Sequence, residues 1–158
     1  VCSVLLNWGL RIGSPVSAVY PSSNLAIYVP FRLLSPCIVA NVFWYNGATV
    51  SGNVDLGVYS ADGTRLLSTG STAQATINSL QSVDIADVQI GAGLNWIAIA
   101  MDNVTGTLFS STFGAVGLHG LMGIKQQASA FALPAVATFA APSSDYLPIF
   151  GFTPRSVL

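Results

Sequence analysis

Few side chains in this sequence could carry out catalysis, and none of them lies in a pattern typical of an active site. His119 is the only histidine, and it is flanked by Gly117-Leu118 and Gly120-Leu121. A serine hydrolase would need this histidine beside an activated serine, but the sequence contains no Gly-x-Ser-x-Gly turn. We therefore predict no catalytic role for His119.

The acidic residues are six aspartates, and a structural role is available for most of them. Asp62-Gly63 is typical of a tight turn, and Asp102-Asn103 is typical of a capped strand end. Asp55 and Asp84 are expected to point outward from strands of alternating polarity. Asp84-Ile85-Ala86-Asp87 could offer oxygens to calcium, but it does not resemble an EF-hand loop. We thus predict no enzyme activity, no metal site and no cofactor.

Aromatic residues offer the best case for a binding site, because β-sandwich lectin modules bind glycans by stacking rings on the sugar. The rings considered for such a platform are Trp44, Tyr45, Tyr59 and Trp96. Trp44 and Trp96 also share strand faces with alanine and valine residues, which favours packing in the core or at a subunit interface. We keep Trp44, Tyr45 and Trp96 as candidate ligand-binding residues and a glycan as an alternative partner.

Charged residues are scarce in this chain. Five Lys and Arg and six Asp make up 7% of it, against about 25% in ordinary soluble domains, and the formal net charge is -1. Nucleic-acid binding would call for clustered Lys and Arg, so we predict none. A surface with so few charges is poorly protected against association. We therefore expect part of it to be buried against copies of the same chain, as in a homo-oligomer, or against other partners.

The long uncharged runs do not indicate a membrane-spanning helix. The run from Leu33 to Val54 contains proline, asparagine and glycine, and β-branched and aromatic residues dominate the remainder. We interpret it as strand, turn and strand, and predict no membrane partner. Cys2 and Cys37 are too few for a disulfide framework or a zinc site, so two buried thiols are expected, with a single disulfide as the alternative.

Alternating runs separated by turn residues predict an all-β protein. Asp62-Gly63 is expected to form a type I′ or related turn between two of the strands. Short strands at this spacing predict an antiparallel β-sandwich, with a jelly roll or a related Greek key as the topology. The expected strands are Leu25–Phe31, Cys37–Tyr45, Val54–Val58, Thr64–Leu67, Gln81–Ile85 and Leu94–Asp102, with a loop or weak edge strand at Gly70–Thr76.

Two of these strands, Cys37–Tyr45 and Leu94–Asp102, are apolar on both faces, so each side must be covered. In the first, alternation places on one face Ile38, Ala40, Val42 and Trp44. We expect a single domain over residues 1–158, with the core sandwich at about residues 20–112. An extended C-terminal segment, about residues 113–158, is too apolar for a free tail and should dock on the sandwich or on a neighbouring subunit. Its one candidate helix is Leu121–Leu133.

Several stretches together resemble a poorly characterised family of tailed-bacteriophage and prophage virion proteins. The likeness covers about residues 25 to 151 and is densest in the strand-turn-strand unit from Gly52 to Thr72. The stretches that carry it are Ala26–Phe31, Trp44–Gly47, Gly52–Leu66, Ser68–Thr72 and Leu147–Gly151.

The resemblance implies a structural protein located in the virion, and it offers no catalytic residue to transfer. A capsid decoration (cement) protein is the role we expect first, and a head fibre or a tail component would also fit. Such proteins are commonly trimeric, and their partners would be other virion proteins such as a major capsid protein. The alternative is a tail or fibre-associated carbohydrate-binding module for host attachment.

Overall fold

The computed structural model describes residues 14–112 and 115–157, which form twelve strands and one short helix. The strands and the helix come in the order β1 (Val16–Val19), β2 (Ala26–Leu33), β3 (Cys37–Tyr45), β4 (Asn53–Ser60), β5 (Arg65–Ser68), β6 (Thr72–Ala73), β7 (Leu80–Ile90), β8 (Gly93–Met101), β9 (Thr107–Thr112), α1 (Val116–Leu121), β10 (Lys125–Gln127), β11 (Tyr146–Pro148) and β12 (Phe150–Val157). Each strand predicted from alternation is present, and β7 runs further than predicted.

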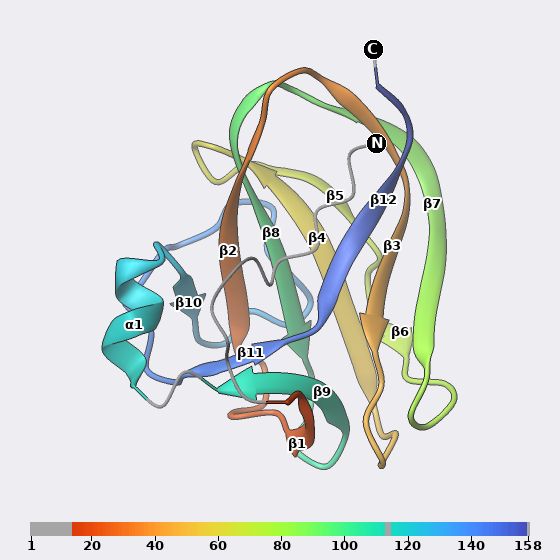
Figure 1. Cartoon of the computed structure of the whole chain (residues 1–158), viewed down its shortest axis with the longest axis vertical. Helices are drawn as coiled ribbons and strands as arrows, with labels where there is room; N and C mark the ends of the chain where they lie inside the picture. Colours follow the sequence, from red (N-terminus) through yellow and green to blue (C-terminus); the bar gives the residue numbers. More distant parts are fainter. Residues whose placement is uncertain (1–13, 113–114, 158) are drawn as a thin grey trace.

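The strands form two layers, and all the paired strands are antiparallel (Figure 1). One layer is a six-stranded sheet in the order β10-β2-β8-β4-β5, with β6 also paired to β4. Facing it is the sheet β12-β3-β7, which the small sheet β1-β9-β11 extends through a bridge between Asn46 and Leu108. The predicted all-β antiparallel sandwich is confirmed, whereas the jelly-roll topology stays a prediction.

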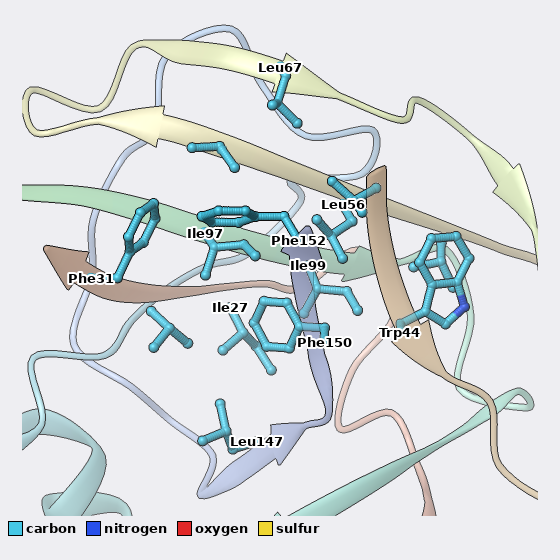
Figure 2. Packing of buried hydrophobic residues seen from close by; sticks show 14 of the residues in the cluster. Ile27, Phe31, Trp44, Leu56, Leu67, Ile97, Ile99, Leu147, Phe150 and Phe152 are labelled. Atoms are coloured by element: carbon cyan, nitrogen blue, oxygen red, sulfur yellow. The ribbon is translucent and has the colours of Figure 1, made fainter. Parts of the chain in front are cut away.

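The main core lies between these layers and is built from the inward face of each alternating strand. Phe150 and Phe152 of β12 point toward Ile97 and Ile99 of β8, and all four side chains are buried (Figure 2). The ring of Phe152 also packs on that of Phe31, with the ring centroids 5.4 Å apart. The C-terminal strand is therefore part of the sandwich rather than an attachment to it.

The central strand β8 is buried on both faces, as its sequence predicted. Ile97 and Ile99 face the main core, while Trp96 and Ala98 face a second cluster that includes Leu133 and the partly buried Phe139. The covering residues come from the loop between β10 and β11 of the same chain. The small alanines on this face of the sheet let that loop approach closely, so no neighbouring subunit is needed to cover it.

The helix predicted over Leu121–Leu133 is wrong. The helix α1 lies earlier, and Met122 caps its end, followed by Gly123 with a left-handed φ of 77°. Lys125–Gln127 then forms strand β10 against β2, and most of the remaining residues to Leu133 form a loop. The glycine breaks the helical repeat, and pairing with an open sheet edge stabilises an extended backbone instead.

The faces predicted for β3 are only half correct. Val42 and Trp44 are buried in the main core, but Val39 replaces Ile38 as the inward residue nearer the strand start. The pairing of β3 with β7 shifts register between Val39 and Asn41. A bulge of this kind reverses which side chains point inward, and strict alternation cannot anticipate it.

The turn at Asp62-Gly63 belongs to the related kind rather than type I′. The Gly63 N–H donates to the Ser60 carbonyl at 3.0 Å, and in this turn only Gly63 has a positive φ, of 87°. A type I′ turn needs positive φ at both central residues. The geometry matches a type I turn closed by a left-handed glycine, which gives the neighbouring β5 its register.

Candidate functional site

Two strands, β3 and β9, together with the junction between β11 and β12 and the segment before β1, form an apolar pocket. We call it the aromatic pocket; its volume is about 210 Å³, and it is lined by Pro15, Tyr45, Phe109 and Ile149. Ile149 lies between β11 and β12, where its carbonyl accepts the Tyr45 N–H at 3.0 Å and its N–H donates to the Phe109 carbonyl at 2.8 Å. The rings of Tyr45 and Phe109 meet edge to face, with centroids 5.0 Å apart.

The chemistry of the aromatic pocket favours an apolar guest. None of its lining side chains is charged, and the hydroxyl of Tyr45 already donates to the carbonyl of Asn78 at 3.3 Å. A sugar would need several hydrogen-bonding groups around the rings, and the lining supplies few of them. The pocket is therefore suited to an aliphatic or aromatic side chain of a protein.

Of the three candidate ligand-binding residues, only Tyr45 lines this pocket. Trp44 is 0% exposed, and its indole N–H donates to Oδ1 of Asn46 at 2.9 Å inside the main core. Trp96 is 8% exposed and packs on Phe139 with centroids 4.5 Å apart, in the other layer. The three side chains thus do not form a common platform, and the two tryptophans occupy core positions.

Tyr59, the fourth ring considered, is also buried. Its hydroxyl donates to the carbonyl of Pro134 at 2.8 Å, and its ring meets that of Tyr28 edge to face. Burial raises the pKa of Tyr28 to about 12 and that of Tyr59 further. Both rings hold the loop between β10 and β11 on the six-stranded sheet instead of facing a ligand.

The helix α1 exposes an apolar surface that sequence reasoning did not single out. The helix lies at the side of the sandwich next to β10 (Figure 1). Its sequence neighbourhood, residues 115–124, contains no Asp, Glu, Lys or Arg. We define the α1 surface by its exposed side chains, which are Val116 (36%), Leu118 (37%), Leu121 (85%) and Met122 (43%).

Within α1, His119 is buried, in contrast to the residues of this surface. Its side chain is buried, and burial lowers its pKa, against the opposing effects of the Asp145 charge and of the Ser144 backbone. Burial thus favours the neutral imidazole over its charged form.

Asp55 is buried, which contradicts the outward position predicted for it. It does lie on the face of β4 opposite Leu56, but the loop between β10 and β11 covers that face. Its carboxylate accepts the hydroxyl of Ser68 at 2.7 Å and the backbone N–H of Leu133 at 2.9 Å. We call this arrangement the Asp55 clasp, because it joins β4 and β5 to the C-terminal segment.

Asp62, Asp84 and Asp102 have the structural roles that the sequence predicted, whereas no such role was predicted for Asp87. Asp102 accepts the backbone N–H of Asn53 at 2.9 Å and the amide of Asn103 at 2.6 Å. Burial alone would raise the pKa of Asp102, but these hydrogen bonds lower it. Asp84 is exposed, and Asp87 pairs with Arg155 at 2.7 Å.

Three further observations concern ligands and partners. Among residues 14–112 and 115–157, no three His, Cys, Asp or Glu side chains gather closely enough to hold a metal ion. The same residues contain no helix with the length and apolar character of a membrane span. Cys37 is buried, and Cys2 lies outside the described residues.

Comparison of the chain with protein-family models, with curated proteins and with solved structures found no match.

Proposed function

We propose that this chain is a non-enzymatic structural protein of a bacteriophage virion, a capsid decoration protein that stabilises the particle through contacts between subunits and with the major capsid protein. The phage setting rests on the sequence resemblance. The use of the chain as an assembly component rests on its surface.

The observation that carries the proposal is the excess of apolar over charged side chains on the surface. Among the described residues, twelve large hydrophobic side chains are exposed. The exposed charged side chains are five: Arg32, Asp62, Asp84, Asp87 and Arg155. Single exposed apolar residues are ordinary in monomers, but here four of the twelve cluster on α1. A surface of this kind is suited to permanent contacts with other protein surfaces.

Mass spectrometry of purified particles tests this function. The chain should be present in a fixed stoichiometric ratio to the major capsid protein. Particles lacking it should release their genome at a lower temperature than complete particles, and adding the purified chain back should restore the difference. Complete particles without the chain would refute the proposal.

A carbohydrate-binding function has weaker support, because Trp44 and Trp96 are inaccessible. Of the three candidate residues, only Tyr45 lines the open pocket, where it lies beside the ring of Phe109. A glycan array with the wild type and a Tyr45→Ala variant would separate the two functions. Binding that depends on Tyr45 would favour the attachment module over the decoration protein.

A further inference from the structure

The α1 surface is apolar, and a partner with an apolar concave site would cover it. Leu121 is 85% exposed, and Leu118 and Met122 beside it are also exposed. The glycines of this region, Gly117 and Gly120, have no neighbouring atoms where a Cβ would be, so the helix stands clear of other elements on that side. Exposure of so many apolar atoms on a helix of six residues is costly unless they are covered.

A lipid bilayer is a poor fit for this surface. Interfacial helices combine a long apolar face with Lys and Arg residues that bind anionic headgroups. Residues 115–124 contain neither lysine nor arginine, the next residue, Lys125, is half-buried in β10, and α1 makes less than two turns. The chemistry of the α1 surface therefore points to a protein partner.

The same chain carries a site of matching chemistry. The aromatic pocket is open, uncharged and about 210 Å³ in volume. An apolar cavity of about 150 Å³ is large enough to hold benzene. A leucine side chain is smaller than that ring, so the pocket has room for Leu121 and for part of a neighbouring side chain.

We propose that Leu121 of one copy inserts into the aromatic pocket of a second copy, with Leu118 and Met122 packing around its rim. This inference rests on the proposed assembly function and names the contact between copies. The two surfaces are different, so the contact is heterologous: each copy offers one α1 surface and one pocket. Contacts of this kind propagate into a closed ring or a chain rather than stopping at a two-fold dimer.

Complementation between two variants tests the proposal. Leu121→Asp removes the inserting side chain but keeps the pocket, while Pro15→Asp places a charge at the pocket but keeps α1. Both positions are exposed, so both variants should fold. In sedimentation velocity each variant alone should associate at least tenfold more weakly than the wild type. An equimolar mixture should form a 1:1 heterodimer, because one intact α1 surface meets one intact pocket.

Leu34→Asp is the matched control. Leu34 is 96% exposed but lies in the turn between β2 and β3, outside both surfaces. This variant should associate like the wild type. Ile149→Lys, which charges the pocket from inside, provides a second pocket variant, and circular dichroism checks the fold of each.

Several results would overturn the inference. The wild type could be monomeric at all concentrations, or Leu121→Asp could associate as strongly as the wild type. The two pocket variants, Pro15→Asp and Ile149→Lys, could each associate like the wild type. The equimolar mixture of Leu121→Asp and Pro15→Asp could also stay monomeric. Flotation of the wild type with anionic vesicles, lost in Leu121→Asp, would assign the α1 surface to lipid instead. Particles that contain the Leu121→Asp chain in normal amounts would keep the decoration function while rejecting this contact.

Discussion

The Asp55 clasp should contribute strongly to the stability of this chain. Asp55→Ala removes the only carboxylate at the junction of β4, β5 and the C-terminal loop. The Leu133 N–H, 2.9 Å from the carboxylate, and the Ser68 hydroxyl, 2.7 Å from it, then lose a charged acceptor. Leu133 is buried where the loop covers the sheet, so water reaches its N–H poorly, whereas Ser68 is half-buried.

The size of the effect follows from these two donors. A buried donor left without a partner costs about 1–3 kcal/mol, so the pair costs at most about 6 kcal/mol, since Ser68 is only half-buried. Removing a buried carboxylate also removes its desolvation penalty, which offsets part of that loss. We expect Asp55→Ala to lower the free energy of unfolding by about 2–4 kcal/mol. Asp55→Asn should cost less, because its amide keeps one acceptor oxygen.

Urea unfolding followed by tryptophan fluorescence measures the loss. Hydrogen exchange should also show faster exchange at the Leu133 N–H, because the loop detaches before the sandwich unfolds. Asp84→Ala is the control, since Asp84 is exposed on β7, and it should change stability by less than about 0.5 kcal/mol. If Asp55→Ala and Asp84→Ala were equally stable, the clasp would not contribute as described.

Three further predictions test the core, the tyrosines and one turn. Phe152→Ala should lower the free energy of unfolding by about 3–5 kcal/mol in urea denaturation, because it empties a fully buried position between the layers. Alkaline solution should unfold the chain. Burial raises the pKa of Tyr28 to about 12 and that of Tyr59 further, while tyrosines in the unfolded chain ionise near pH 10, so high pH favours the unfolded state. The stability that the neutral tyrosines contribute is complete below pH 10 and is lost as the pH rises toward 12. Absorbance at about 295 nm should show that the tyrosines ionise as the chain unfolds. Ionisation of these tyrosines while the chain stays folded would contradict the prediction. Gly63→Ala should lower the free energy of unfolding by about 1–2 kcal/mol, because φ is 87° and the new Cβ would lie 3.3 Å from the ring of Phe139. Thermal denaturation measures this change, and an unchanged midpoint would show that the turn relaxes without strain.

Much of the sandwich could be predicted because alternation is a local property of the chain. Strands such as Cys37–Tyr45 appear with the predicted bounds, and the inward positions of Leu56 in β4 and Ile27 in β2 follow the period of two. Gly63 sits at a predicted turn for the same reason, since its backbone freedom is a property of the residue. The covering of β8 on both faces could also be predicted, because both faces of that strand are apolar.

The candidate site could be predicted only in part, because its residues come together through the tertiary structure. Tyr45 was one candidate, yet Phe109 and Ile149 reach it from β9 and from the junction of β11 and β12. No local pattern links these positions.

What the sequence by itself determined is therefore the type of fold, most strands and the shortage of surface charge. The tertiary structure decided which faces are covered. It buried Asp55 under a distant loop, moved Val39 inward through a bulge, and replaced the middle of the predicted helix at Leu121–Leu133 with the strand Lys125–Gln127 on the edge beside β2. Each of these outcomes depends on a partner segment far away in the chain, and a pairing energy between distant segments leaves no local trace in the sequence.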